Sequence, residues 1–252
     1  VVDKPFTLTV AEARDLAALA EARGLLLSVF HNRRWDADFL TLQALIADGR
    51  LGRIVRFESH FDRFRPQVRD RWREADVPGA GIWYDLGPHL IDQALVLFGR
   101  PLGVTADLAI LREGGQATDY AHAVLRYDGF RVILHADMTS PAADLRFSVQ
   151  GDRAAWIKSG LDIQEDQLKT HGRAGGDSWG RDPRPGMLVD GVTGAHVPTD
   201  DASGDYRRYY DQVALAISGR APNPVPPEQA IAVMEVLEAG LLSAARRAEQ
   251  PL

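Results

Sequence analysis

The most informative stretch of this chain is Gly79–Asp92, with the sequence GAGIWYDLGPHLID. Pro88 suits the first position of a helix, and Gly99 is a typical residue just after a helix end. We therefore expect a helix from about Pro88 to Phe98. Its apolar side would carry Leu90, Ile91, Ala94, Leu95, Leu97 and Phe98. His89 falls on the other side, so the spacing predicts that it lies off the core face, near a cleft.

Asp85 and His89 stand four residues apart where a glycine-rich turn becomes this helix. A carboxylate and an imidazole held at that spacing suit a proton-transfer site. The alternative is that Asp85 only caps the turn, and that His89 is a surface imidazole in the first helical turn. The spacing alone leaves both interpretations open.

The first 30 residues predict a strand, a helix and a second strand. Pro5 disfavours helix at the preceding Lys4, so the chain begins as the end of a strand that delivers a lysine to a turn. Thr9 and Glu12 form a capping-box pattern, and Gly24 would end that helix before a buried strand at 25–30. This order is typical of a parallel crossover, the tail of a doubly wound domain.

From Arg53 onward the pattern changes to strands. Apolar Val55, Phe57 and Phe61 alternate with polar Arg56, Glu58, His60 and Asp62, so one sheet face is packed and the other is polar. Asp128-Gly129 joins strands at 120–127 and 130–138 as a hairpin. Further strands are expected at 104–111, 145–150 and 155–158, and helices at 38–47, at 205–218 and from Pro227.

The predicted fold class is therefore α/β plus α+β. Residues 1–30 would be the C-terminal remnant of a Rossmann-like domain. Residues 31–252 would form an open-faced, mainly antiparallel β-sheet domain with helices on one side. The terminal helix could pack back on the nucleotide domain.

Composition excludes several classes of protein. The chain has 252 residues, 45% of them hydrophobic, which is enough for a sizeable core. A net charge of −6 argues against nucleic-acid or anionic-membrane binding through bulk charge. The absence of cysteine excludes disulfides and thiolate metal sites. No apolar run approaches the roughly 18 residues of a membrane span, so no membrane partner is expected.

Asp3-Lys4-Pro5, followed some eighty residues later by the Asp85–His89 motif, resembles the Gfo/Idh/MocA family of nicotinamide-dependent oxidoreductases. That family usually has Glu where Asp3 stands. The runs 31–36 (HNRRWD), 84–93 (YDLGPHLIDQ) and 178–180 (SWG) look like the branch containing bacterial sugar and scyllo-inositol dehydrogenases. The resemblance covers essentially the whole chain.

The resemblance implies hydride transfer between NAD or NADP and a secondary alcohol of a sugar or inositol. His89 would be the base, and Asp85 would hold its imidazole in one tautomer. Lys4 and Pro5 would contact the cofactor, and the Lys4 charge would stabilise the developing alkoxide. No metal ion is expected, because no metal-binding His spacing occurs in the sequence. A small-molecule polyol or sugar is the expected partner.

Further substrate contacts are expected from residues in or beside the family-like segments. These candidates are Asn32, Arg33, Tyr84, Asp92 and Trp179. Asp92 could instead only buttress its helix. Trp179 lies in the irregular stretch 170–186, which favours a disordered surface loop over a lid above substrate. The arginine cluster from Arg63 to Arg73 favours a solvated loop over an active-site border.

The Gly-x-Gly-x-x-Gly loop of a dinucleotide-binding domain does not occur in these 252 residues. We therefore expect a fragment, inactive by itself, of a longer parent enzyme. The resemblance further implies a homodimer or homotetramer formed through the open sheet face, and a cytoplasmic location.

Other functions use the same residues. A glycosidase of this fold that oxidises its substrate transiently with NAD would employ the same Lys and His. A non-catalytic sugar or nucleotide sensor would retain the fold without the acid–base pair. A divalent-metal isomerase or hydrolase would draw on scattered ligands such as His31 and His135, without any local metal-binding motif.

Overall fold

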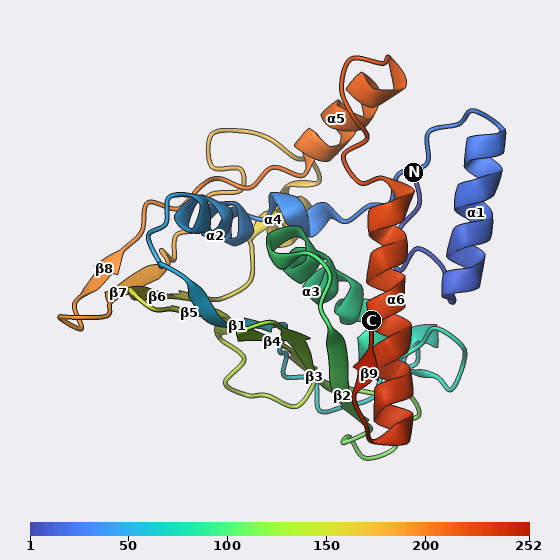
Figure 1. The fold of residues 1–252 in the computed structure, drawn as a ribbon, viewed down its shortest axis with the longest axis horizontal. Coiled ribbons are helices and arrows are strands. Elements are labelled where there is room, and N and C mark those ends of the chain that lie inside the picture. Colours follow the sequence, from blue (N-terminus) through green and yellow to red (C-terminus); the bar gives the residue numbers. More distant parts are fainter.

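A computed structural model describes all 252 residues and is built around a single nine-stranded sheet (Figure 1). The strand order is β8-β7-β6-β5-β1-β4-β3-β2-β9, and every neighbouring pair is antiparallel except the parallel pair β1 and β4. The strands are β1 Ile54–His60, β2 Gly103–Ala109, β3 Tyr120–Tyr127, β4 Phe130–Asp137, β5 Leu145–Gly151, β6 Ala154–Ser159, β7 Met187–Asp190, β8 His196–Pro198 and β9 Gln250–Pro251. The mainly antiparallel sheet is confirmed.

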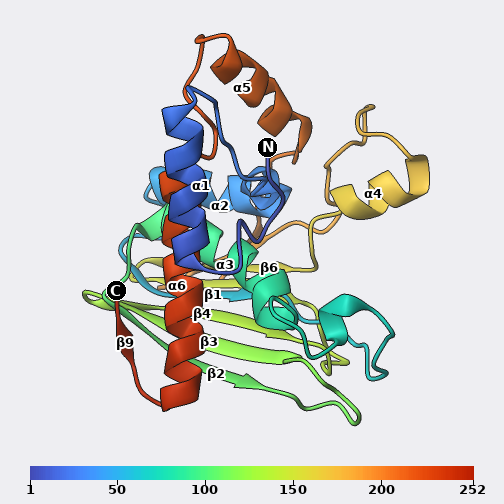
Figure 2. The ribbon, with the colours of Figure 1, turned by 90° about the vertical axis from the view of Figure 1, so that its right-hand side faces the viewer.

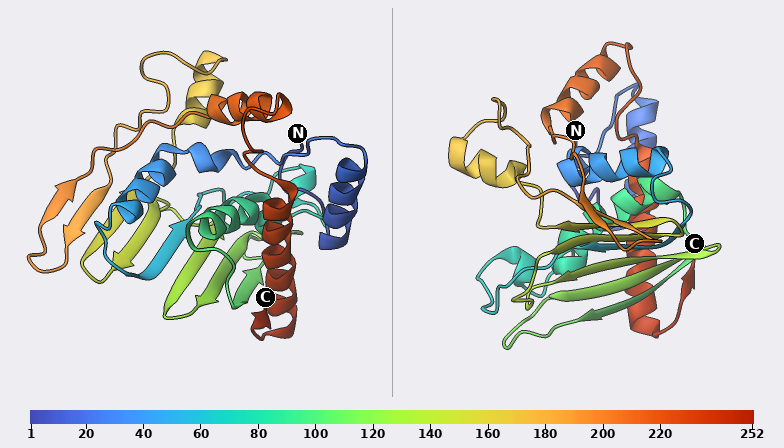
Figure 3. Two further views of the ribbon diagram at one scale, coloured as in Figure 1. Left: turned by 45° about the horizontal axis from the view of Figure 1, so that its top comes forward. Right: turned by 90° about the vertical axis from the view of Figure 1, so that its left-hand side faces the viewer.

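The helices lie on one face of this sheet and at its β2 edge, and no helix covers the opposite face (Figures 2 and 3). The α-helices are α1 Val10–Ala22, α2 Ala37–Ala47, α3 Ile82–Phe98, α4 Gln164–His171, α5 Arg207–Ile217 and α6 Pro227–Arg246. Two short 3₁₀ helices, η1 Asn32–Trp35 and η2 Trp72–Glu74, connect them. The predicted mixed α/β architecture with one open sheet face is thus present.

The core lies between the sheet and the helices. Along β1, Phe57 and Ser59 are fully buried, whereas Arg56 on the other face is exposed, as the alternation predicts. The Phe57 ring packs against Phe98 of α3, with centroids 5.4 Å apart, and against Phe147 of β5, at 5.7 Å. Aromatic contacts therefore join the helical layer to two neighbouring strands.

Helix α3 begins at Ile82, six residues before the predicted start. Gly81, with φ of 90°, ends the preceding loop, and the Ile82 N–H donates to the Thr118 carbonyl. Pro88 therefore lies inside the helix, where the missing hydrogen bond costs about 3 kcal/mol. Burial of Ile82 and Trp83 in the first turn offsets that cost, because each fully buried large apolar side chain contributes about 1.5–3 kcal/mol. The prediction from Pro88 was wrong because packing outweighs local preference.

The N-terminal segment differs in part from its prediction. Helix α1 and its capping box at Thr9 and Glu12 are confirmed. The stretch 25–30 is not a strand, because it meets the start of the chain through a single parallel bridge between Val2 and Val29. A Rossmann-like sheet is therefore not seen in residues 1–30. The two extended segments do lie side by side, with the Phe30 N–H donating to the Val2 carbonyl at 2.8 Å.

Helix α6 joins α1 to the sheet. It packs against α3, α1 and strand β2, and Figure 1 shows it standing beside α1. The Glu238 side chain accepts a hydrogen bond from the Val10 N–H at 2.6 Å, and Glu235 pairs with Arg14, also at 2.6 Å. None of the helices is both long and apolar enough to span a membrane.

We expect the variant Phe57→Ala to lower the free energy of unfolding by about 3–5 kcal/mol, because it opens a cavity among aromatic rings that cannot close up completely. Val192→Ala, at a residue that is 94% exposed, should change it by less than about 0.5 kcal/mol. Urea unfolding at constant pH measures both. A loss below about 1 kcal/mol for Phe57→Ala would contradict the described core.

Candidate active site

Lys4 and Asp85 meet at the junction between the N-terminal segment and α3. The Lys4 ammonium lies 3.1 Å from Asp85 Oδ1 and also donates to the Asp85 main-chain carbonyl. Only 12% of the Lys4 side chain is exposed. Burial lowers the pKa of Lys4, and the neighbouring Asp85 carboxylate limits that decrease. An ammonium with reduced hydration is therefore held at a fixed position beside α3.

Asp85 is held as a carboxylate by cations rather than by His89. Burial works against the charged form, yet Lys4 and then Arg73 bring the pKa of Asp85 below its usual value. The Arg73 Nε lies 3.5 Å from Asp85 Oδ1. The His89 Nδ1 has no hydrogen-bond partner. The expected hydrogen bond from His89 to Asp85 is thus absent, because Lys4 approaches the carboxylate from the N-terminal segment.

His89 is buried, with 6% of its surface exposed, so the prediction that it lies off the core face was wrong. Its ring stacks against Phe61 at a centroid distance of 6.3 Å. Burial, followed by the positive charges of Lys4 and Arg33, holds the pKa of His89 well below its ordinary value. His89 is consequently a neutral imidazole near pH 7, with one ring nitrogen unpaired inside the protein.

Three arginines border this imidazole and carboxylate, and two of them come from the predicted solvated loop. Arg73 faces Asp85, and Arg63 stacks over the Phe61 ring at 5.0 Å. Burial and the charge of Arg65 lower the pKa of Arg63 to about 10. The third, Arg146, contributes to the low pKa of His89. Residues 63–73 are exposed or partly exposed, as predicted for a solvated loop, while Arg63 and Arg73 also face Phe61 and Asp85.

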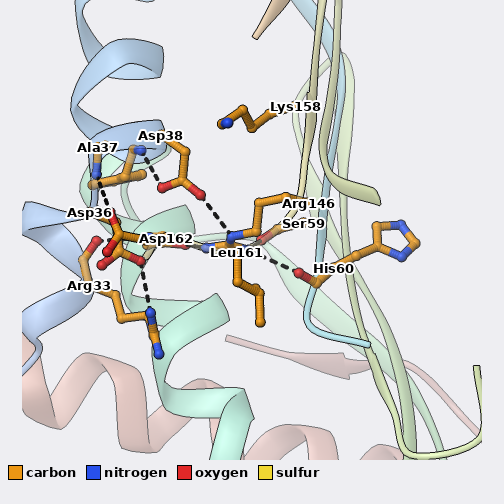
Figure 4. Close-up of polar contacts among 12 residues, drawn as sticks. Arg33, Asp36, Ala37, Asp38, Ser59, His60, Arg146, Lys158, Leu161 and Asp162 are labelled. Atoms are coloured by element: carbon orange, nitrogen blue, oxygen red, sulfur yellow. Dashed lines mark hydrogen bonds and ion pairs between the residues drawn. The ribbon is translucent and has the colours of Figure 1, made fainter. Parts of the chain in front are cut away.

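Arg146 also belongs to a network of buried polar side chains (Figure 4). Arg146 of β5 donates to Ser59 at 2.8 Å and to the Gln93 side chain of α3 at 2.7 Å, and it pairs with Asp38 of α2 at 3.2 Å. Arg33 pairs with Asp36 at 3.2 Å. These contacts fix the positions of the elements that surround His89.

Among the predicted substrate residues, one has a side chain without a hydrogen bond in the chain, and the others already form hydrogen bonds within the protein. Asn32 is only 9% exposed, and its side-chain amide forms no hydrogen bond within the chain, so it retains donors and an acceptor for a ligand. Arg33 instead binds Asp36, Glu165 and the Tyr206 hydroxyl. Its guanidinium is largely occupied by the protein.

The other three candidates contact the protein rather than one another. The Tyr84 hydroxyl donates to the Leu8 carbonyl at 3.1 Å. Asp92 forms a two-pronged ion pair with Arg34, at 2.8 and 2.6 Å, and is 2% exposed. Trp179 is buried and donates to Asp205 at 3.0 Å, so this residue is anchored to the fold, whereas most of the stretch 170–186 is exposed, as predicted for a surface loop.

Sequence reasoning missed His31 and Arg146 as neighbours of His89. His31 is 2% exposed, both of its ring nitrogens lack a partner, and its charge contributes to the low pKa of His89. The family-like run 31–36 already contained His31, so the sequence held a signal for it. Arg146 stands in an unremarkable strand, and only tertiary structure brings it to the site.

Comparison with known proteins assigns the family. The C-terminal α/β domain of the Gfo/Idh/MocA oxidoreductase family matches residues 43–252. The chain belongs to this family. It is 54% identical over 250 residues to the protein named "Uncharacterized oxidoreductase YdgJ" of Escherichia coli, covering 98% of this chain and 72% of that protein.

Two further relatives agree with the assignment. The scyllo-inositol 2-dehydrogenase (NADP(+)) IolW of Bacillus subtilis is 39% identical over 247 residues, covering 96% of this chain and 69% of that protein. The solved structure of an oxidoreductase from Yersinia pestis superposes with a TM-score of 0.94 at 50% identity, covering all of this chain and 72% of the other. The resemblance read from the motifs is confirmed, and the chain is part of an oxidoreductase.

We expect the variant Asp92→Asn to lower the free energy of unfolding by about 3–5 kcal/mol at pH 7, because it leaves Arg34 buried without its counter-charge. Arg34 lowers the pKa of Asp92 in spite of burial, so the stabilisation is present above the unfolded-state pKa near 4 and is lost as pH falls through the lower folded-state value. The difference between the two proteins should therefore shrink in acid.

Denaturant unfolding at pH 7 and at pH 3 measures this difference. Asp166→Asn is the matched control, since its pair with Lys169 is 71–82% exposed and should matter by less than about 1 kcal/mol. Equal stability of Asp92→Asn and the parent at pH 7 would contradict the buttressing role.

Proposed function

We propose that the protein carrying this sequence is an NAD(P)-dependent dehydrogenase that acts on a secondary alcohol of a sugar or inositol. The main support is the pairing of a neutral, unpaired imidazole at His89 with a partly dehydrated ammonium at Lys4. The relative named scyllo-inositol 2-dehydrogenase (NADP(+)) supports the substrate class.

His89 is proposed as the general base. Its low pKa keeps the imidazole free to accept the hydroxyl proton. Nδ1 is the shielded, unpaired nitrogen, so Nε2 is the atom that a substrate hydroxyl would approach. The surrounding cations, Lys4, Arg33 and Arg146, disfavour a positive charge on the His89 imidazole. That repulsion would help His89 to release the proton again.

Lys4 is proposed to stabilise the alkoxide that develops as the proton leaves. An ammonium held by Asp85 needs little reorganisation during the reaction, and reduced hydration strengthens its field. Asp85 would act by positioning Lys4 rather than by orienting His89. This assignment differs from the one made from the motif alone.

The residues present fit one side of a nicotinamide site. Lys4 and Pro5 would lie against the ring, since the Lys4 ammonium uses only two of its three N–H donors within the chain. The bound cofactor would accept or return the hydride at the substrate carbon. No glycine-rich phosphate loop occurs in these residues, so they do not decide between NAD and NADP.

Asn32 is the strongest candidate for binding a substrate hydroxyl, because its amide has no partner within the chain. Arg33, Tyr84, Asp92 and Trp179 would shape the site mainly through the contacts that they already make within the protein. A site with one free amide and several cations suits a neutral polyol that becomes anionic during reaction.

We expect the variant His89→Asn, in the full protein that carries these residues, to reduce kcat by about 10²–10⁴-fold. Lys4→Met should reduce kcat by about 10²–10³-fold, the usual cost of one oxyanion-stabilising group. The affinity for cofactor should change little with His89→Asn. The assay is nicotinamide-dependent absorbance with a panel of inositols and sugars.

His171→Asn, on the exposed face of α4, is the matched control and should retain full activity. In the parent protein the acid limb of kcat/KM against pH should lie below 6.5, since the base titrates below its ordinary pKa. Unchanged turnover in His89→Asn would remove His89 from the mechanism. No turnover of any polyol by the parent would favour a sensor instead.

We also propose that two copies of the protein pair through the open face of the sheet. No helix covers this face (Figure 3), and its outward residues on the central strands include Ile133, Val124 and Tyr120, which are only partly buried in one chain. Apolar side chains left partly exposed at the centre of a sheet are stabilised when a partner covers them. A closed two-fold dimer, or a tetramer built from such dimers, would do so.

We expect Ile133→Glu to dissociate this oligomer, because a carboxylate at the centre of the interface would be buried without a counter-charge. Sedimentation velocity should show a dimer or tetramer for the parent and a smaller species for the variant. Val192→Glu, on an exposed turn far along the chain, should leave the oligomer intact. A monomeric parent would refute the proposal.

A further inference from the structure

A second polar cluster lies on the opposite face of the sheet from His89. His60 and Asp62 stand two residues apart and so share one face, while Ser59 and Phe61 between and beside them face the helical layer and are fully buried. Figure 4 shows the His60 ring on the far side of the strand from Arg146. The oxidoreductase site uses none of these outward side chains.

The strand register brings a histidine from another segment to the same place. His60 of β1 is the direct partner of His135 on the neighbouring parallel strand β4. Pairing continues past the end of β1, since the Phe61 N–H donates to the His135 carbonyl and the Arg63 N–H to the Asp137 carbonyl, both at 2.9 Å. These bonds hold Asp62 beside His135.

The donor atoms of these three residues converge. One ligand atom each from His60, Asp62 and His135 lies within 4.8 Å of the others. Asp62 Oδ2 is 3.1 Å from His60 Nδ1, and Asp62 Oδ1 is 3.7 Å from His135 Nε2. Two ligands of one tetrahedral zinc, each bound at about 2.0–2.2 Å, lie about 3.3–3.6 Å apart. The two separations between Asp62 and the imidazoles are close to that spacing.

Neither possible placement of the proton between His122 and His135 gives His135 Nε2 a good hydrogen-bond partner. His135 Nδ1 lies 3.2 Å from His122 Nδ1, so one proton serves both nitrogens. If His135 carries it, the lone pair on Nε2 faces the carboxylates of Asp62 and Asp137, at 3.7 and 3.6 Å. If His122 carries it, the Nε2 proton points at oxygens that are too distant for a good hydrogen bond.

The carboxylate of Asp62 also lacks a permanent cation. Its side chain is 9% exposed, its Oδ1 is buried without a hydrogen-bond partner, and only the two imidazoles lie within ion-pairing distance. Glu58 nearby is already paired with Arg56 at 2.7 Å. A buried carboxylate beside two histidines and no lysine or arginine is a favourable environment for a metal ion.

We propose that His60, Asp62 and His135 bind one divalent transition-metal ion, with Zn²⁺ preferred for its imidazole and carboxylate ligands. The contact between His122 and His135 Nδ1 fixes the ring so that Nε2 faces the ion, which is the usual arrangement around a metal-binding histidine. A fourth position remains for water.

The ion would hold β1 to β4 on the face that no helix covers, so its role is structural and separate from hydride transfer. The proposal does not depend on the assigned dehydrogenase activity, because a metal-binding measurement needs neither substrate nor cofactor. It does not depend on dimer formation either, since all three ligand side chains are at most 16% exposed in a single chain.

The test is titration of the chelator-treated full protein with Zn²⁺ by calorimetry and with Co²⁺ by visible spectroscopy. We expect one ion per chain and the d–d bands of a four-coordinate Co²⁺ site. Asp62→Asn and His135→Gln should each weaken binding by at least about 100-fold. His122→Phe should weaken it by about 10–100-fold, as loss of a supporting hydrogen bond does.

His196→Gln is the matched control, because His196 is an exposed histidine on β8 of the same sheet, and it should bind as the parent does. Circular dichroism checks that each variant is folded. Absence of stoichiometric binding by the parent overturns the proposal whatever the variants do. Binding that is lost in His196→Gln and kept in His135→Gln overturns it as well.

Discussion

The arrangement of the layers depends on the contacts of the buried Arg146 guanidinium. It extends from β5 and reaches Asp38 of α2, Gln93 of α3 and Ser59 of β1. Burying a charge costs several kcal/mol unless it is paired and hydrogen-bonded, so these partners must all be in place when the protein folds. The result is a fixed distance between the sheet and the two helices that enclose the site.

This constraint has an electrostatic consequence. Burial lowers the pKa of His89, and the positive charges of Lys4, Arg33 and Arg146 add to that effect. The imidazole therefore remains neutral in a cationic region, while Asp85 is kept charged by Lys4 and Arg73. Titratable groups whose pKa values are shifted by burial and by neighbouring charges are typical of functional sites. The polar core thus supports both the architecture and the chemistry.

The two faces of the sheet differ because strand residues alternate. Phe61 stacks on His89 on the inner face, while its neighbours His60 and Asp62 lie on the outer one. The hydrogen bond that Arg146 donates to the His60 carbonyl connects the two faces at one residue. A metal ion bound on the outer face would order β1. It would therefore also stabilise the inner site, which this strand borders.

Local signals in the sequence are sufficient to predict several elements, and the motifs are sufficient to indicate the family. The Asp128-Gly129 turn, the Thr9 capping box and the alternation along β1 depend on neighbouring residues, so they could be predicted. Lys4, Asp85 and His89 were singled out from motifs in the same way. The short elements α4, β7, β8 and β9 lack such a signal.

The contacts between residues distant in sequence follow from the three-dimensional fold alone. The start of α3 was mispredicted because burial of Trp83 outweighs the local preference of Pro88. Asp85 turns to Lys4 because a segment eighty-one residues away supplies a cation. The parallel register of β1 and β4 sets His60 beside His135, and no spacing along the chain encodes that pairing. Such contacts follow from packing and charge in three dimensions, which a one-dimensional pattern does not contain.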